Sequence, residues 1–414
     1  ETFTPASNFD LIAVTVPSEL TYTNILHFLK LADIPLRSKD RPGTPLILAG
    51  GIAVFNPEPL AHFIDAFFLG EAEDQFIEIL RAAAEIKKPE RSREKIFNLF
   101  DRHSCIYIPE KHKNSFYEKS TDYYCLGGKE KVIQTGKTLR TFKKAFPARL
   151  DNAPVPLFPP LPDTEIVQAR CQVEIARGCP RSCRFCAAGF FYRPYRERTL
   201  ANIQDCGLQV MRNTGFDEFN LSGLSVSDYS KSSELIETMS DTAGRLGVSL
   251  SLPSLRINTL AGEDLAALSV VRRSGLTFAI ETPGERGRNI IKKDITNQEI
   301  FSTIDKVRKN GWKLVKFYFM IGLPFLENED TEIAEFLLKI AHTFPGLKIN
   351  VNINTFVPKP NTPFQWAKFI LPEKAHAVLE KIQNKLAGCR RIVIRTQNPD
   401  LSYIEAFLAG GSAE

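Results

Sequence analysis

The chain has 414 residues, of which 43% are hydrophobic and 24% are charged. This is the balance of a globular protein, and it excludes a disordered, collagenous or coiled-coil chain. Lys and Arg outnumber Asp and Glu by 53 to 48, a formal net charge of +5, which permits a nucleic-acid partner without indicating one. Eight cysteines in this length are too few for a disulfide scaffold, so their spacing carries the information.

Hydropathy gives no sign of a membrane or export segment. The most apolar stretch, residues 46–55, is interrupted by Gly50 and Gly51 and is shorter than the ~20 residues that cross a bilayer. The chain begins Glu1-Thr2-Phe3, without an initiator Met or a basic-then-apolar signal pattern. We therefore expect a fragment or trimmed chain, no membrane partner and a reducing, cytoplasmic location.

The first 88 residues alternate between strand and helix patterns. Strands are expected at residues 10–16, 45–49 and 66–69, and helices at residues 22–32, from 57 and from 71. Such alternation with short glycine turns predicts a parallel, doubly wound, Rossmann-like sheet. Three strands are only part of such a sheet, so we expect residues 1–88 to be an incomplete domain.

Residues 89–164 are expected to form a connector. Gly127-Gly128 suggests a turn between short antiparallel strands, and the prolines of residues 153–163 predict a stiff, extended linker. Basic residues of the segment 137–149 alternate with Phe142 and Phe146. Basic charge with stacking rings suits single-stranded RNA, although a solvated strand pair would have the same composition.

Residues 165–370 contain six strand–helix units. The strands are expected at residues 172–176, 218–221, 249–252, 277–281, 314–320 and 348–356, and the helices at 200–212, 233–246, 265–274, 298–310 and 331–341. Six right-handed βα units predict an open or closed barrel whose chemistry lies at the carboxyl ends of its strands. Residues 371–414 add a helix at 373–386, a strand at 391–396 and a short tail, an extension that could close the barrel edge.

The strongest chemical signal directly follows the first barrel strand. Cys179, Cys183 and Cys186 have the spacing C-x3-C-x2-C, and three thiolates on one loop can bind three irons of a cubane cluster. The fourth iron is then open to a substrate-like molecule, as in catalytic metal sites. We expect Arg177, Arg181 and Arg184 to lower the pKa values of these thiols.

Two other interpretations of the cysteines stay open. A zinc knuckle would need a fourth ligand, and the candidate histidines, His103 and His112, are remote in the sequence. The three cysteines could also be unrelated core residues.

The cysteine spacing, with Phe185 before the last cysteine, resembles the radical S-adenosylmethionine (SAM) superfamily. The resemblance extends over residues 173–366 and implies a partial (β/α)6 barrel with a 4Fe-4S cluster on Cys179, Cys183 and Cys186. It also implies that the open iron binds SAM, which is cleaved reductively to a 5′-deoxyadenosyl radical. An electron donor such as flavodoxin or ferredoxin is then required.

The same resemblance implies SAM contacts at successive strand ends. Glu281 would bond the ribose hydroxyls and Arg286 the SAM carboxylate, while Ser222 or backbone carbonyls would accept from the amino group. The full set expected to bind the cofactor is Phe185, Ser222, Gly223, Ser254, Arg256, Glu281, Arg286, Lys316 and Gly322. The alternative is that charged residues at strand ends are merely solvated.

The N-terminal segment resembles the second half of a cobalamin-binding domain. The resemblance rests on Gly50-Gly51, the run Asn56-Pro57-Glu58-Pro59, and Asp65 followed by an apolar strand and Gly70-Glu71. A flavodoxin-like sheet is the alternative. The family's lower-ligand motif, Asp-x-His-x-x-Gly, is only imitated at Asp101-Arg102-His103 because position 106 is Ile106, so cobalamin binding stays open.

Together the two halves resemble cobalamin-domain radical SAM proteins of an uncharacterised bacterial branch. The resemblance implies methyl transfer to an RNA, protein or small-molecule substrate, with a ribosome-linked substrate as one option. One rival is a methylthiotransferase-like enzyme, but the cysteines that would hold its second cluster, Cys105, Cys125 and Cys171, are scattered. The other rival is a non-catalytic iron–sulfur or RNA-binding scaffold.

Overall fold

The computed structural model describes residues 3–43, 45–86, 92–112, 141–166, 169–252, 256–257 and 276–411. The chain divides into two compact units: unit 1 comprises Glu1–Pro147 and Gly411–Glu414, and unit 2 comprises Ala148–Gly410. The domain boundaries expected after residues 88, 164 and 370 stay predictions. No helix in the described ranges is long and apolar enough to span a bilayer.

Unit 1 is built on a four-stranded sheet. Its strands are β1 (Leu11–Thr15), β2 (Leu46–Gly50), β3 (Ala66–Phe68) and β4 (Ile106–Tyr107), in the order β1-β2-β3-β4. The first three pair in parallel and β4 pairs antiparallel with β3. The first four residues of β2 are all buried, as expected of a parallel sheet that is covered on both faces.

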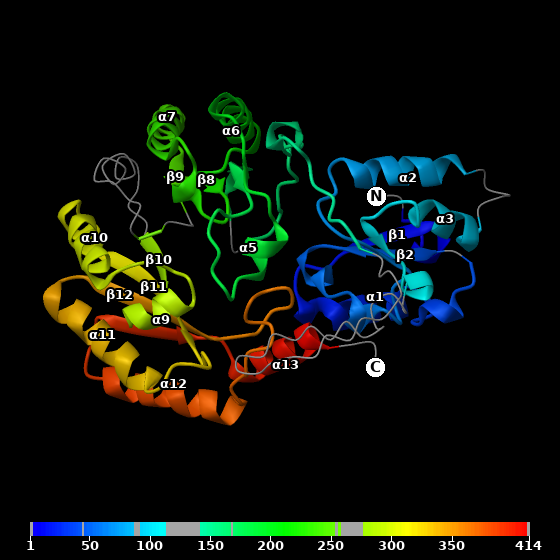
Figure 1. Cartoon of the computed structure of the whole chain (residues 1–414). Helices are drawn as coiled ribbons and strands as arrows, with labels where there is room; N and C mark the ends of the chain where they lie inside the picture. The colour runs from blue at the N-terminus through cyan, green and yellow to red at the C-terminus, as the bar shows by residue number, and fades with distance from the viewer. Residues whose placement is uncertain are drawn as a thin grey trace. The chain divides into compact units, whose positions relative to one another are not determined.

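Helices cover this sheet. They are α1 (Tyr22–Leu31), α2 (Gln75–Glu85) and α3 (Arg93–Phe100). Figure 1 shows α1 and α2 on opposite sides of the sheet, and Ile79 of α2 and Phe97 of α3 share a core with Leu48 and Phe68. The mixed α/β, Rossmann-like architecture confirms the fold class expected from the sequence.

Two helix predictions in unit 1 were wrong. The segment from Pro57 forms only a 3-10 turn, Glu58–Leu60, because Pro57 and Pro59 lack the N–H groups that a longer helix would use. The helix expected from Glu71 begins at Gln75. The described residues contain 3-10 turns at Ala6–Asn8, Glu19–Thr21, Ser38–Asp40, Ile52–Phe55, Glu58–Leu60, Leu150–Asn152 and Val226–Asp228.

Unit 2 contains two parallel sheets. One has the order β5 (Cys171–Glu174), β8 (Glu218–Ser222), β9 (Ser249–Ser251), and the other β10 (Leu276–Glu281), β11 (Leu314–Ile321), β12 (Lys348–Thr355), β13 (Ile392–Thr396). All these pairings are parallel. A short antiparallel pair, β6 (Ala176–Arg177) with β7 (Arg196–Glu197), lies beside them.

Helices alternate with these strands, as the barrel prediction requires. They are α5 (Ala187–Phe191), α6 (Leu200–Thr214), α7 (Ser232–Arg245), α9 (Glu285–Ile290), α10 (Asn297–Lys309), α11 (Glu329–Thr343), α12 (Pro372–Leu386) and α13 (Pro399–Gly410). Helices α6 and α7 share a core with β5 and β8, and α10, α11 and α12 share one with the second sheet (Figure 1). Unit 2 is therefore a partial (β/α) barrel whose two sheets are not joined into a closed ring in the described residues.

The C-terminal extension enlarges the second sheet. Strand β13 pairs with β12, so the expected strand adds to the sheet at its edge, and the expected short tail is largely helix α13. The helix expected at 265–274 and the antiparallel strands expected around Gly127-Gly128 lie outside the described residues.

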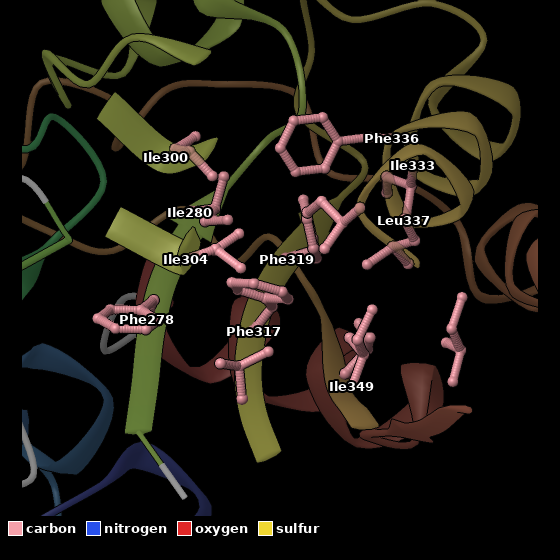
Figure 2. Close-up of a cluster of buried hydrophobic side chains, with 14 of the residues drawn as sticks. Phe278, Ile280, Ile300, Ile304, Phe317, Phe319, Ile333, Phe336, Leu337 and Ile349 are labelled. Carbon is pink, nitrogen blue, oxygen red and sulfur yellow. The ribbon is translucent and has the colours of Figure 1, made fainter. Parts of the chain in front are cut away.

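Strict alternation along β11 and β12 separates an apolar face from a polar one. Phe317, Phe319 and Ile349 are fully buried against helix residues such as Ile304 and Leu337 (Figure 2). The intervening side chains are half-buried on the opposite face, which we call the inner face. The inner-face residues of these two strands are Leu314, Lys316, Tyr318, Met320, Asn350, Asn352 and Asn354, with Lys348 exposed at the start of β12.

Glu329, the first residue of α11, fixes the turn after β11. Its carboxylate accepts hydrogen bonds from the N–H of Gly322 at 2.8 Å and of Leu323 at 3.3 Å. Burial raises the pKa of this carboxyl to about 7, because the charged form is poorly solvated there.

Replacing Gly51 by Ala should destabilise unit 1. Gly51 has a φ of 108°, and a Cβ there would lie 2.7 Å from the Val16 carbonyl oxygen, so strain of about 1–3 kcal/mol or more is expected. The control is Gly50→Ala, whose Cβ would lie 3.6 Å from its nearest neighbour. Thermal melting followed by circular dichroism should show a lower midpoint for Gly51→Ala; equal midpoints would contradict the prediction.

The raised pKa of Glu329 predicts a pH-dependent contribution to stability. Because the native state binds this proton more tightly than the unfolded state, the contribution is greatest at low pH and is lost as pH rises from about 4.5 to about 7. The melting midpoint of the protein minus that of Glu329→Gln should therefore be larger at pH 5 than at pH 8. Glu335→Gln, an exposed change on the same helix, should show no such trend, and a pH-independent difference for Glu329→Gln would contradict the assignment.

Candidate active site

The three cysteines lie on a loop whose ends are held together by backbone pairing. The antiparallel pair β6–β7 brackets the loop, with Arg177 opposite Arg196. Gly178 opens it with a φ of 86°, and a Cβ at this position would lie 2.6 Å from the Tyr192 carbonyl oxygen. Only glycine fits this tight start.

Backbone hydrogen bonds fix the cysteine loop further along. The N–H of Arg184 donates to the Ile291 carbonyl at 3.0 Å, and its guanidinium donates to the Ile290 carbonyl at 2.8 Å. Cys186 precedes α5, where its Sγ accepts a hydrogen bond from the Gly189 N–H at 3.4 Å. The loop is therefore attached to the end of α9 as well as to β6 and β7.

The cysteines line one pocket of unit 2 together with strand ends. Its volume is about 340 Å³. The lining residues come from the cysteine loop, the turn after β8, the segment after β9, the strands β10 and β11, and the segment after α9. They are Cys179, Arg181, Cys183, Phe185, Cys186, Leu224, Ser225, Arg256, Thr277, Ala279, Glu281, Lys293 and Tyr318. This is the carboxyl-terminal end of the sheets, where barrel enzymes hold their active sites.

An ion pair and a second cation occupy this pocket. The Lys293 ammonium donates to Glu281 Oε1 at 2.8 Å, with both side chains 12% exposed. Glu281 ends β10 at an irregularity of the ladder with a φ of 70°, which turns its side chain out of the strand's regular alternation. Arg256 donates through Nη2 to the Asp294 carbonyl at 2.9 Å.

The expectation that arginines lower the thiol pKa values is confirmed only for Arg181, and burial outweighs its effect. Burial raises the pKa values of Cys179 and Cys183, because desolvation disfavours thiolates, while Arg181 lowers the pKa of Cys179 by a smaller amount. Arg177 is paired with Glu174 at 2.7 Å and Arg181 with Asp228. The cation that does lower the pKa of Cys183, against the larger effect of burial, is Lys293.

In the described ranges no three Cys, His, Asp or Glu side chains gather closely enough to share one metal ion. The three cysteines line a pocket whose other lining residues include no His and no fourth Cys, whereas a structural zinc site takes four such ligands. Three thiolates are the number that binds three irons of a cubane cluster.

The structure brings some of the residues expected to bind SAM together, and leaves others apart. Phe185, Arg256 and Glu281 line the pocket with the cysteines, whereas Arg286 is exposed on α9 and does not line it. The five other members of the expected set lie elsewhere. Ser222 and Gly223 precede the lining residues of the β8 turn, Lys316 lies on the inner face of β11, Gly322 follows β11, and Ser254 lies outside the described residues.

Sequence reasoning missed Lys293, Thr277 and Tyr318 as lining residues. The alternation of β10 and β11 could have identified Thr277 and Tyr318, because both share the inner face with Lys316. Lys293 follows a short helix rather than a strand, so no local pattern marks it.

In unit 1, the pattern taken to resemble a cobalamin domain is used by the chain itself. A Cβ on Gly51 would meet the backbone of Val16, and one on Gly70 would meet the backbone of Ala145. The Asp65 carboxylate is paired with Arg93 at 2.8 Å and with Arg41 at 3.1 Å. Internal contacts of unit 1 therefore account for Gly51, Gly70 and Asp65, and these residues do not form an open cradle for a corrin ring.

The described part of the basic segment is also engaged internally. Phe142 packs edge-to-face on Tyr107 with ring centroids 5.5 Å apart. The Lys144 ammonium lies 4.0 Å from Glu71 and 5.6 Å from the centre of the Phe146 ring. These contacts favour the structural interpretation over the RNA-contacting one for residues 141–149; Lys137 and Arg140 lie outside the described residues.

Comparison with known proteins supports the assignment of both units. Residues 173–337 match the family model of the radical SAM superfamily, and residues 1–109 match that of the N-terminal region of radical SAM proteins. The uncharacterized protein MJ0966 of Methanocaldococcus jannaschii is 29% identical over 414 residues, which are 99% of this chain and 80% of the relative.

Solved structures share the architecture at low identity. The radical SAM methyltransferase TsrM of Kitasatospora setae, with tryptophan and a SAM analogue, has a TM-score of 0.56 at 10% identity, covering 97% of this chain and 87% of TsrM. TsrM with cobalamin and a 4Fe-4S cluster has a TM-score of 0.54 at 11% identity, covering 86% and 66%. The cobalamin-dependent radical enzyme OxsB has a TM-score of 0.52 at 13% identity, covering 79% and 43%.

At these identities the solved structures show a common fold and nothing more. The two family models and the C-x3-C-x2-C loop at the head of the barrel carry the assignment. The family's two cofactors are a 4Fe-4S cluster and SAM. The chain belongs to the radical SAM superfamily.

Proposed function

We propose that Cys179, Cys183 and Cys186 hold a 4Fe-4S cluster and that SAM binds beside it in the 340 Å³ pocket. The observation that carries the proposal is that the three cysteines, Glu281 and Arg256 line this one pocket. Three thiolates leave one iron without a protein ligand, which is the position a substrate-like molecule can take.

The bound cofactors supply reductive cleavage of SAM to a 5′-deoxyadenosyl radical, which takes a hydrogen atom from the substrate. The chain's own residues position and shield the reactants. Lys293 orients the Glu281 carboxylate, which we assign to the ribose hydroxyls of SAM. Arg256 replaces Arg286 as the group for the SAM carboxylate, because Arg256 lines the pocket and Arg286 does not. An electron donor such as flavodoxin or ferredoxin is part of this proposal.

We further propose that the overall reaction is methyl transfer. The support for this reaction type is the likeness of fold to TsrM and OxsB. The glycines and the aspartate of unit 1 do not fit a corrin cradle, because their neighbours are backbone and arginine groups of the same unit. Cobalamin binding at those residues is therefore not part of the proposal.

The methylthiotransferase alternative has less support. Cys105 is 1% exposed in the core of unit 1, and Cys171 is 3% exposed in the core beneath α6 and α7. Buried thiols in two separate cores are poorly suited to share a second cluster. The third cysteine of that hypothesis, Cys125, lies outside the described residues.

Cys183→Ala should abolish cluster assembly and SAM cleavage, because one iron loses its protein ligand. After anaerobic reconstitution, the unchanged protein should hold about four irons and yield 5′-deoxyadenosine with SAM and dithionite. Cys389→Ala, a half-buried cysteine after α12, is the matched control and should behave as the unchanged protein. If the Cys183→Ala protein still yields 5′-deoxyadenosine, the cluster assignment is contradicted. If the unchanged protein holds iron but cleaves no SAM, the alternative of a non-catalytic iron–sulfur scaffold is favoured.

Arg256→Ala should weaken SAM binding by roughly 10- to 150-fold, the value of a hydrogen bond to a charged group. Arg286→Ala removes the same charge from the exposed surface of α9 and should leave the SAM Kd unchanged. Calorimetric titration of SAM into the reconstituted proteins measures both values. If Arg286→Ala weakens SAM binding and Arg256→Ala does not, Arg286 rather than Arg256 binds the SAM carboxylate.

A further inference from the structure

Three asparagines occupy alternate positions of β12. Asn350, Asn352 and Asn354 are half-buried on the inner face, whereas Ile349, Val351 and Ile353 between them are packed in the core with the helices. Burial of these three apolar side chains fixes the orientation of the strand. The three amides are consequently directed away from the helices, and we call them the asparagine row.

The asparagine row has no partner of its own in the described chain. No side-chain hydrogen bond joins Asn350, Asn352 or Asn354 to another described residue, and the same holds for Lys316 and Tyr318 on the neighbouring strand. A half-buried amide that bonds only to water loses little when a ligand replaces that water with an equivalent bond. Five adjacent unengaged polar side chains therefore form a surface suited to a ligand rich in donors and acceptors.

The other sheet of unit 2 also has an inner-face amide with an unused acceptor. Asn220 of β8 is 3% exposed, and its Oδ1 has no hydrogen-bond partner among the described residues. Its strand neighbours Phe219 and Leu221 belong to the core with α6 and α7, so Asn220 belongs to the inner face of its own sheet. An unsatisfied buried acceptor is costly unless something bonds to it.

The spacing of the row matches an extended peptide. A strand rises about 3.3 Å per residue, so alternate side chains repeat at about 6.6 Å, and an extended peptide repeats its N–H and C=O groups on one side at the same interval. Each Asn amide offers a donor and an acceptor. A peptide lying along β12 can therefore give one backbone amide to each asparagine in turn.

The row is adjacent to the cysteine pocket. Asn352 lies opposite Tyr318 of β11, and Tyr318 lies opposite Ala279 of β10; Tyr318 and Ala279 line the pocket. Neighbouring strands are about 4.8 Å apart. A peptide on the row is thus within a side chain's reach of the pocket in which we place SAM.

Single-stranded nucleic acid fits this surface less well. It is bound by successive stacking rings and by cations that follow the phosphates. On β11, β12 and β13 the inner face carries the ring of Tyr318 and few cations: Lys316, the exposed Arg395 on β13, and Lys348 at the start of β12. The polar groups of this inner face are therefore mainly side-chain amides, which suit a peptide backbone better than stacked bases and phosphates.

We propose that the asparagine row binds the substrate as an extended peptide segment, through its backbone, beside the SAM pocket. This inference rests on the proposed function for the reacting cofactors, but the binding that it names can be measured separately. A backbone-directed row would accept many sequences and would lose affinity for peptides whose N–H groups are methylated.

The test uses the reconstituted full chain and three fluorescein-labelled probes: a random octapeptide pool, its N-methylated counterpart, and a random RNA dodecamer. Anisotropy should show that the octapeptide pool binds more tightly than the other two. The triple variant Asn350→Ala, Asn352→Ala, Asn354→Ala should lose at least about 10-fold in affinity for it, as three amide contacts would give. Asn352→Asp, which keeps size and an acceptor but loses the donor, should fall between.

Asn384→Ala, an exposed change on α12, is the control and should bind the octapeptide pool normally. SAM cleavage without substrate should be unchanged in the control Asn384→Ala. If the unchanged protein cleaves no SAM, the proposed function is refuted, whereas the peptide site is still judged by the binding measurements. The peptide site is refuted if the octapeptide pool fails to bind, if the triple variant binds it equally well, or if the RNA binds more tightly.

Discussion

Every second side chain of β11 and β12 is buried against α10, α11 and α12, and this burial decides what faces the inside of the barrel. Phe317, Phe319 and Ile349 cannot leave the core without exposing large apolar surfaces. A slip of one residue would exchange the two faces. The positions of Tyr318 and of the asparagine row therefore follow from the apolar packing on the other side of the same strands.

The cysteine loop obeys a different constraint, because it has no regular alternation to hold it. Backbone hydrogen bonds provide the rigidity: the β6–β7 pair closes the loop, and Arg184 ties it to the end of α9. Its arginines are engaged by carboxylates and carbonyls. Positive charge near the thiols comes from Arg181 at Cys179 and from Lys293 at Cys183, and Lys293 also pairs with Glu281 in the pocket. The groups that hold the cysteine loop in place are thus different from the side chains whose charges act on its thiols.

Several predictions from local sequence failed for a common reason. Arg286 follows a strand end and was expected near SAM, yet the first turns of α9 carry it to the surface, and Arg256 lines the pocket instead. Gly51 and Gly70 were taken as places where a cofactor approaches the backbone, but Val16 and Ala145 of the same unit fill those places. A glycine in the sequence indicates that some group lies close to the backbone there, but it does not show whether that group is a cofactor or another part of the chain.

The sequence by itself determined the α/β class, most of the longer strands and helices, and the C-x3-C-x2-C loop, because hydrophobic periodicity and ligand spacing are local properties. Tertiary structure alone decided which strand-end residues meet in one pocket, since Lys293 and Glu281 are brought together by the turn of α9. It also decided the neighbours of the asparagine row, because register between β11 and β12 depends on packing of residues distant in sequence.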